Sequence, residues 1–247
     1  MLTLKEAGLK GPPYLAPFNA HIDTGELLVI IGPNGAGKST LLGLLSGFHC
    51  PDQGSVHLDG RCLSHWPAKA LAARRAVVAQ KDRPIFAWRV EELVTLGAQG
   101  QVSQPWLHEL DLTSLAERSV LTLSGGELQR VMIARALAQL DGPVLGTRYL
   151  LLDEPTSALD IGQQQSLMRL LRRLTRQYDL SVICVLHDLN LASSFADRIW
   201  LLNDGQRIAA GRPDEVLRAQ QLAHIYRAEL EDIPHPSDRG HWLALKR

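Results

Sequence analysis

Residues 27–40 read Leu-Leu-Val-Ile-Ile-Gly-Pro-Asn-Gly-Ala-Gly-Lys-Ser-Thr. The apolar run 27–31 predicts a short buried strand, and the Gly-Pro step after it predicts a loop. Residues 39–47 are rich in leucine and end in glycine, which predicts a helix closed at its C-terminus. Strand, glycine-rich loop and helix in this order indicate the beginning of an α/β fold with helical crossovers.

The loop from Gly32 to Ser39 has glycine, four residues and then Gly-Lys-Ser, which is the P-loop pattern. Its glycines let backbone N–H groups surround phosphate oxygens, and the following helix directs its positive end at the same anion. Lys38 is expected to reach the β- and γ-phosphates, and the Ser39 hydroxyl to ligate Mg²⁺. The residue frequencies of this chain give about 0.004 chance matches, so a fortuitous glycine turn is a poor alternative.

Two further apolar runs, 149–152 and 181–186, predict buried strands. Leucines at helical spacing between 167 and 174 predict a helix that separates them. The alternation of strand and helix predicts an α/β protein with a parallel sheet.

Polar residues follow these strands directly. Asp153 and Glu154 come after the second strand, where an aspartate can hold Mg²⁺ and a neighbouring glutamate can orient or deprotonate a water. His187 follows the third strand, and ligands of open α/β sheets bind at the carboxyl ends of the strands. A γ-phosphate contact from His187 is therefore expected, although spacing alone does not establish it and a lone histidine is more often structural.

Residues 81–145 have fewer strand-like runs, and 106–117 and 125–140 are expected to be helical. We interpret this region as a helical subdomain inserted into an ATP-binding core made of 1–80 and 146–231. The stretch 141–148 is a turn-rich link back to the sheet, and 232–247 has two prolines and little periodicity, which is typical of an appended tail.

The sequence Leu123-Ser124-Gly125-Gly126-Glu127 precedes the second of these helices. Ser124 and Glu127 have the spacing of a capping box, which explains both residues without any ligand. The two glycines exceed that explanation and also suit an anion site at a helix N-terminus. Residue chemistry leaves both interpretations open.

Charge and composition exclude several classes of protein. Lys and Arg number 26 and so do Asp and Glu, so the formal net charge of zero argues against a protein that holds nucleic acid by bulk charge. Three cysteines are too few for a disulfide framework. No basic segment followed by an apolar run begins the chain, and no apolar run spans a bilayer, so action at a membrane is expected to need a partner. Eight histidines lack paired spacing beside carboxylates or cysteines and are expected to be surface or core residues: His21, His49, His57, His65, His108, His224, His235 and His241.

The motifs together resemble the nucleotide-binding subunit of an ABC transporter. The resemblance covers essentially the whole chain and rests on the order and spacing of six features. These are the P-loop, Gln80, residues 123–127, Leu-Leu-Leu-Asp-Glu-Pro at 150–155, Ser-Ala-Leu-Asp at 157–160 and His187. It implies a P-loop NTPase fold with a RecA-like parallel-sheet core, an N-terminal antiparallel β part and the inserted helical subdomain.

The resemblance also implies a homodimer in which the signature residues of one chain cap the γ-phosphate held by the P-loop of the other. Gln80 would sense Mg²⁺ and the attacking water, Asp160 would cross the dimer interface, and Tyr14 is the candidate to stack on adenine. The implied ATP-binding residues are Gly32, Pro33, Asn34, Gly35, Ala36, Gly37, Lys38, Ser39, Thr40, Ser124, Gly125, Gly126, Asp160 and Tyr14. The implied catalytic residues are Lys38, Gln80, Glu154 and His187, and the implied Mg²⁺ residues are Ser39, Gln80 and Asp153.

Within that family the chain is similar to the ATPases of importers for haem, iron chelates and cobalamin. Residues 64–72, 184–192, 196–199 and 235–236 look most like haem (hemin) importer ATPases, whereas 15–23 looks more like the cobalamin version. Haem is favoured, with cobalamin or an iron-siderophore as alternatives. The implied partners are two copies of a polytopic membrane permease and, indirectly, a periplasmic binding protein, but no nucleic acid. The implied location is the cytoplasmic face of the bacterial inner membrane.

The loop after Gln80 contains Phe86 and Trp88, which suit either a surface that docks the permease or a local apolar core. Two other functions fit the sequence less well. A non-transport ABC ATPase would need tandem cassettes, a coiled-coil insertion or a basic face, none of which the sequence has. A module that binds nucleotide without hydrolysis would be expected to lack Glu154 or His187.

Overall fold

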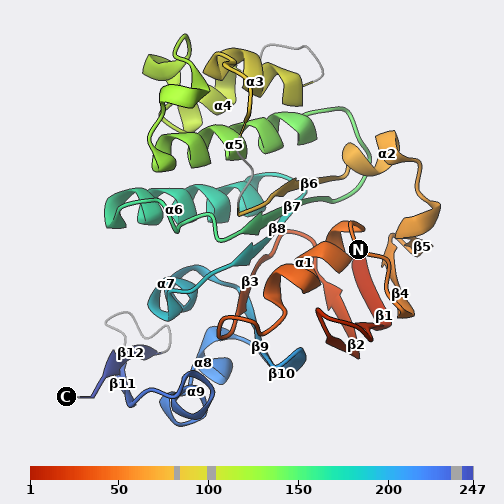
Figure 1. Cartoon of the computed structure of the whole chain (residues 1–247), viewed down its shortest axis with the longest axis vertical. Helices are drawn as coiled ribbons and strands as arrows, with labels where there is room; N and C mark the ends of the chain where they lie inside the picture. Colours follow the sequence, from red (N-terminus) through yellow and green to blue (C-terminus); the bar gives the residue numbers. More distant parts are fainter. Residues whose placement is uncertain (81–83, 99–103, 235–240, 247) are drawn as a thin grey trace.

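The computed structural model describes residues 1–80, 84–98, 104–234 and 241–246 (Figure 1). Within these ranges the strands are β1 Leu2–Leu9, β2 Leu15–Ile22, β3 Leu27–Ile31, β4 Gln53–Leu58, β5 Arg61–Cys62, β6 Arg75–Val78, β7 Arg148–Asp153, β8 Leu180–Val185, β9 Arg198–Asn203, β10 Gln206–Gly211, β11 Leu230–Pro234 and β12 His241–Leu245. The α-helices are α1 Lys38–Ser46, α2 Ala68–Ala72, α3 Val90–Gly97, α4 Gln104–Glu109, α5 Gly125–Leu140, α6 Ile161–Gln177, α7 Leu189–Phe195, α8 Pro213–Val216 and α9 Ala219–Tyr226.

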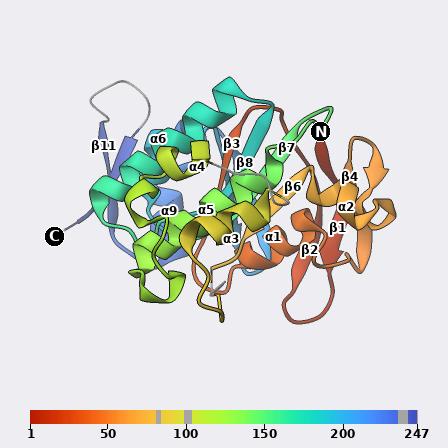
Figure 2. The ribbon, with the colours of Figure 1, turned by 90° about the horizontal axis from the view of Figure 1, so that it is seen from above.

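In the described part of the chain the main sheet has the strand order β10-β9-β3-β8-β7-β6. Its strands from β9 to β6 are parallel, and β10 pairs antiparallel with β9 at one edge. A separate antiparallel sheet has the order β2-β1-β4-β5. Figure 2 places this second sheet and β11 at opposite ends of the molecule. The expected α/β core with an N-terminal antiparallel part is confirmed.

The central strand β3 is buried on both faces, as a parallel strand covered on both sides must be. Leu28 and Ile30 join an apolar cluster with α1 and the antiparallel sheet. Leu27, Val29 and Ile31 join the larger cluster on the other face, with α5, α6 and α7. Helix α1 therefore lies between the two sheets (Figure 1), with its N-terminus at the carboxyl end of β3.

Most helices and strands expected from the sequence are present: β3, α1, β7, α6, β8 and α5 cover the predicted segments. The predicted helix 106–117 is wrong in extent, because α4 ends at Glu109 and Asp111 takes a left-handed conformation with φ 54°. The Arg130 guanidinium accounts for the early end, since it donates to the backbone carbonyls of Leu110 and Asp111 at 3.0 and 3.2 Å. Those carbonyls therefore have a hydrogen-bond donor without the N–H groups of a further helical turn.

The C-terminal region contains more regular structure than its sequence predicted. Strands β11 and β12 pair antiparallel from Leu230–Leu245 to Pro234–His241. The hairpin buries few side chains: Leu243 is buried, whereas Trp242 and Leu245 are exposed. Because Leu243 is the buried side chain among residues 242–245, the sequence of β12 shows little apolar alternation, and the hairpin is not predicted from it.

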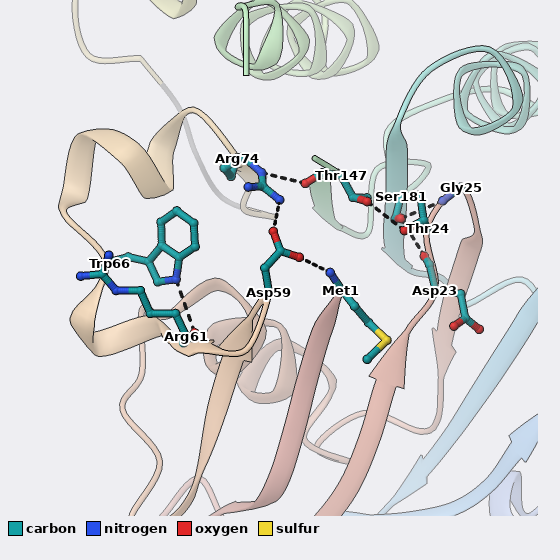
Figure 3. Close-up of polar contacts among 10 residues, drawn as sticks. All are labelled: Met1, Asp23, Thr24, Gly25, Asp59, Arg61, Trp66, Arg74, Thr147 and Ser181. Atoms are coloured by element: carbon teal, nitrogen blue, oxygen red, sulfur yellow. Dashed lines mark hydrogen bonds and ion pairs between the residues drawn. The ribbon is translucent and has the colours of Figure 1, made fainter. Parts of the chain in front are cut away.

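A chain of polar contacts joins the antiparallel sheet to the amino ends of strands in the main sheet (Figure 3). Asp59 pairs with the Met1 amino group and with Arg74, whose Nη2 is 2.6 Å from Oδ2. Arg74 Nε donates to the Thr147 carbonyl at 2.9 Å, and the Thr147 and Thr24 hydroxyls lie 2.8 Å apart. Burial acts to raise the pKa of Asp59, but the hydrogen bonds from Met1 and Arg74 outweigh it and lower that pKa.

Replacing the buried Arg74 is expected to destabilise the protein. Arg74→Met loses the pairs with Asp59 and Thr147 as well as the cation–π contact of the guanidinium with Trp66, so the free energy of unfolding should fall by about 2 kcal/mol. The exposed Arg61 stacks on the same indole, and Arg61→Met is the control, with an expected change below about 0.5 kcal/mol.

The pH dependence follows from the lowered pKa of Asp59. A carboxyl whose pKa is lowered in the folded state stabilises the fold at any pH above its pKa in the unfolded state. This stabilisation is lost as the pH falls through the pKa of the folded state. Chemical denaturation should therefore show the Arg74→Met difference shrinking below about pH 4. An equal difference at pH 3 and pH 7 would contradict the ion pair as its cause.

Candidate functional site

The P-loop connects β3 to α1 and requires glycine at two positions. A Cβ on Gly32 would lie 2.2 Å from the Leu202 carbonyl oxygen, so no side chain fits beside β9. Gly37 stands at the N-cap of α1 with φ 93°, a conformation that glycine adopts without strain. With no capping side chain there, the first N–H groups of α1 face the loop and form a site for an anion.

Lys38 lies inside this loop and is 7% exposed. Its ammonium donates to the carbonyls of Gly32 at 2.8 Å and Pro33 at 2.9 Å. Burial lowers the pKa of Lys38, and the charges of Glu154 and Asp153 act in the opposite direction. A buried cation is therefore held at the centre of the phosphate-binding loop.

Asp153 ends β7 close to the Ser39 hydroxyl. Burial raises the pKa of Asp153, and the nearby Glu154 charge raises it further, while Ser39 and Lys38 act to lower it. Its Oδ1 is buried and has no hydrogen-bond partner in the described residues. A buried carboxylate oxygen without a partner, next to a hydroxyl, suits a hard cation that prefers oxygen ligands.

Glu154 is held between two side chains from neighbouring strands. Its Oε2 accepts a hydrogen bond from Gln80 Nε2, and its Oε1 lies 2.5 Å from His187 Nε2. Gln80 follows β6, Glu154 follows β7 and His187 follows β8, which are adjacent in the sheet. The carboxyl ends of three adjacent strands thus bring Gln80, Glu154 and His187 into contact, as expected for a parallel sheet.

A cavity of about 330 Å³ lies over the P-loop, and Glu154 lines it, whereas Gln80, Asp153 and His187 are not among its lining residues. Tyr14 borders it and is 49% exposed. The lining residues are Pro13, Tyr14, Asn34, Gly35, Ala36, Gly37, Lys38, Ser39, Thr40, Glu154, Asp204 and Gly205.

Sequence reasoning missed Pro13, Asp204 and Gly205. The Asp204-Gly205 turn joins β9 to β10, and a Cβ on Gly205 would lie 2.6 Å from the Tyr14 carbonyl oxygen. The Gly205 carbonyl accepts from the Ala16 N–H at 2.7 Å. The Asp-Gly dipeptide signals a tight turn, but nothing local in it indicates that the turn holds Tyr14 at the P-loop.

The signature residues lie apart from this cavity, and none of them lines it. Ser124 caps α5: its Oγ accepts from the Glu127 N–H at 3.3 Å, and Glu127 Oε2 accepts from the Ser124 N–H at 2.7 Å. The capping box is confirmed. A Cβ on Gly126 would lie 3.0 Å from the Ala158 carbonyl oxygen, so close packing accounts for this glycine.

Asp160, also apart from the P-loop cavity, caps α6 and accepts from the Gln163 N–H at 2.8 Å. Ser124, Gly125 and Asp160 are all exposed. They are therefore available to a second molecule rather than to the P-loop of their own chain.

Phe86 and Trp88 are 63% and 37% exposed, and the neighbouring Ile85 is 83% exposed. The interpretation of Phe86 as part of a local core is wrong. Lys81, Asp82 and Arg83 lie outside the described residues.

In the described ranges there is no cluster of three or more His, Cys, Asp or Glu side chains that could hold a metal ion. His235 lies outside these ranges. No helix among the described residues has the length and apolarity needed to cross a bilayer.

The family model for ABC transporters matches residues 15–157. The chain belongs to the ABC transporter family. This ABC protein is an ATPase, and ATP is its nucleotide. It is 48% identical over 221 residues to the hemin import ATP-binding protein HmuV of Enterobacter cloacae, covering 85% of this chain and 83% of that one. It is 44% identical over 231 residues to HmuV of Hahella chejuensis, covering 90% of each.

Solved ABC structures share its fold. An inward-facing metal-chelate type ABC transporter matches with TM-score 0.80 and 27% identity over 99% of this ABC protein and 96% of that chain. The dimeric bacterial ABC transporter cassette MJ0796 matches with TM-score 0.73 and 28% identity over 85% and 98% of the two chains.

Proposed function

We propose that this ABC ATPase energises the import of haem (hemin) across the bacterial inner membrane, at whose cytoplasmic face it lies. Identities of 48% and 44% to two hemin import ATP-binding proteins, over most of both chains, carry this proposal. Cobalamin and iron-siderophore are the alternative cargos, and the structural likeness to a metal-chelate type transporter favours the second of these.

The cargo can be tested with the proposed permease and binding-protein partners of this chain. Proteoliposomes containing the complete complex should hydrolyse ATP several-fold faster when the binding protein carries haem. Cobalamin or a ferric siderophore should give only the unstimulated rate. Stimulation by either of these and not by haem would reject haem as the cargo while leaving the transport ATPase intact.

The geometry around the P-loop cavity supports the following hydrolytic mechanism. Lys38 and the N–H groups of the loop bind the β- and γ-phosphates, and Tyr14 stacks on the adenine. Glu154 accepts a proton from water as that oxygen attacks the γ-phosphorus in line with the bond to ADP. Gln80 and His187 hold the Glu154 carboxylate through its two oxygens and so orient the base.

Ser39, Asp153 and Gln80 are the proposed residues for Mg²⁺. The partnerless Asp153 Oδ1 and the adjacent Ser39 hydroxyl fit an oxygen-preferring cation. When bound, Mg²⁺ neutralises charge on the phosphate oxygens.

Asp153→Asn provides a stability test of this site. Because the folded pKa of Asp153 is raised, its ionised form costs stability as the pH rises through that pKa, and a neutral amide removes the cost. In the absence of nucleotide the variant should be more stable by about 1 kcal/mol, a rise in Tm of roughly 2–4 °C, and should lose hydrolysis. Thermal unfolding measures this, with the exposed Asp179→Asn as the unchanged control. A lower Tm would contradict the assignment of a desolvation cost.

The proposed active form is a homodimer. Ser124, Gly125, Gly126 and Asp160 of one chain would complete the nucleotide site of the other. The positions of these residues support the proposal. The N-terminus of α5 and Asp160 lie outside the P-loop cavity of their own chain, and Ser124, Gly125 and Asp160 are exposed.

The proposed permease contact is the exposed apolar segment with Ile85, Phe86 and Trp88, at the start of the inserted helical subdomain 81–145. Aromatic anchors dominate many interfaces. Phe86→Ala with Trp88→Ala should weaken binding to the detergent-solubilised permease by about tenfold or more, while the ATPase rate of the free protein stays within about twofold. Tyr178→Ala, at another exposed aromatic, is the control for this pull-down titration. Unchanged permease affinity in the double variant would reject the contact.

A further inference from the structure

The C-terminal hairpin, β11 and β12, contacts the helix that follows His187. We propose that this hairpin is a positioning element of the ATPase site, which holds His187 in place through the first turn of α7. The inference rests on the proposed role of His187. It assigns a role to β11 and β12, which the P-loop mechanism does not use.

The anchor is a two-point contact between Asn190 and the backbone of β12. Asn190 Nδ2 donates to the Leu243 carbonyl at 3.1 Å, and the Leu243 N–H donates to Asn190 Oδ1 at 2.8 Å. The amide thus satisfies both backbone groups of Leu243, as a paired strand would. The Leu243 side chain is 8% exposed and lies in the same apolar cluster as Leu186 and Ala192 on either side of His187.

Helix α7 transmits this contact directly to His187. Asp188 is its N-cap, and Asp188 Oδ1 accepts from the N–H groups of Asn190 at 2.8 Å and Leu191 at 2.9 Å. His187 precedes this cap, and its Nε2 lies 2.5 Å from Glu154 Oε1. A helix of seven residues depends on tertiary contacts for its position, so the contact that fixes Asn190 also fixes where the chain leaves His187.

The hairpin can hold α7 because it is fixed independently at its other strand. Asp232 Oδ1 on β11 accepts from the Ala219 N–H at 3.0 Å, at the beginning of α9. The Lys246 N–H donates to the Glu229 carbonyl at 2.9 Å and closes the open end of the hairpin. Figure 1 shows the hairpin beside both α7 and α9. The hairpin therefore connects α7 to a second helix of the core.

Asn190→Leu tests the anchor, because leucine has a similar size but can make neither hydrogen bond. We expect the kcat for ATP to fall about five- to tenfold, since small displacements of a catalytic group are costly, while the KM stays within about twofold. Ser194→Ala is the matched control on the same helix, because it removes only the hydroxyl that donates to the Asn190 carbonyl within α7 and keeps the backbone carbonyl that accepts from Arg172. It should retain at least half of the wild-type kcat.

A double-variant cycle separates positioning from general destabilisation. In the His187→Ala background, Asn190→Leu should change the residual kcat by less than about twofold, because the group it positions is already absent. An equal loss in both backgrounds would overturn the proposal, as would a wild-type kcat for Asn190→Leu.

If the His187→Ala variants hydrolyse ATP too slowly for a kcat to be measured, a spectroscopic measurement tests the position of His187 instead. In ¹⁵N-histidine-labelled protein, the His187 ring signals, identified by their loss in His187→Ala, should shift in Asn190→Leu and stay in place in Ser194→Ala. Unshifted signals would overturn the inference. If His187→Ala itself hydrolyses ATP at the wild-type rate, the proposed role of His187 fails, which is distinct from a failure of the hairpin alone.

Discussion

Glu154→Gln is expected to hydrolyse ATP at least about 100-fold more slowly than the wild-type protein, with ATP affinity within about threefold. The amide keeps the size of the carboxylate but cannot accept the proton of the attacking water. Its contacts explain why the effect should be confined to turnover, since Glu154 bonds Gln80 and His187 rather than the P-loop amides. Phosphate release at saturating ATP measures the rate, and equilibrium binding of labelled ATP measures the affinity.

The same variant should accumulate as a dimer. If two chains enclose ATP, the variant holds them closed in Mg²⁺ and ATP, and light scattering should give twice the mass measured without nucleotide. Glu117→Gln removes an exposed carboxylate elsewhere and should leave both rate and mass unchanged. A wild-type rate in Glu154→Gln would remove Glu154 from the role of base.

The P-loop, Asp153, Glu154 and His187 could be predicted because each signal is local. An apolar run followed at once by a polar residue identifies a strand end, and parallel strands present those ends on one edge of the sheet. The Asp204-Gly205 turn could not be predicted in the same way. It reaches the cavity because β9 lies beside β3 in the sheet, and this pairing joins segments about 170 residues apart.

For the signature segment, residues 123–127, the sequence allows both a capping box and an anion site, and the structure limits which residues need the second explanation. The capping box explains Ser124 and Glu127, and the approach of the Ala158 carbonyl explains Gly126. Gly125 has no comparable constraint, because its Cβ would meet only the Ala158 Cβ at an ordinary 3.4 Å. Gly125 is exposed at the helix N-terminus, where it is open to contact from the proposed second ATPase chain.

Lys38→Ala is expected to weaken ATP binding by about 100-fold, or roughly 3 kcal/mol, and to slow hydrolysis as well. Lys38 is a buried ammonium in the P-loop, so its loss removes a charge-assisted contact in both the bound and the transition state. The stability of the protein should not fall in parallel. Burial lowers the pKa of Lys38, which means that its charge costs folding free energy at neutral pH.

The combination of effects distinguishes this variant from an unfolded one. Calorimetric titration with ATP should give the affinity loss, while thermal unfolding without nucleotide should give a Tm equal to or above that of the wild type. Lys69→Ala, an exposed lysine of α2, is the control and should bind ATP normally. An unchanged Kd in Lys38→Ala would contradict its role at the phosphates. A Tm lowered by more than a few degrees would mean that the bonds to Gly32 and Pro33 outweigh the cost of burying the charge.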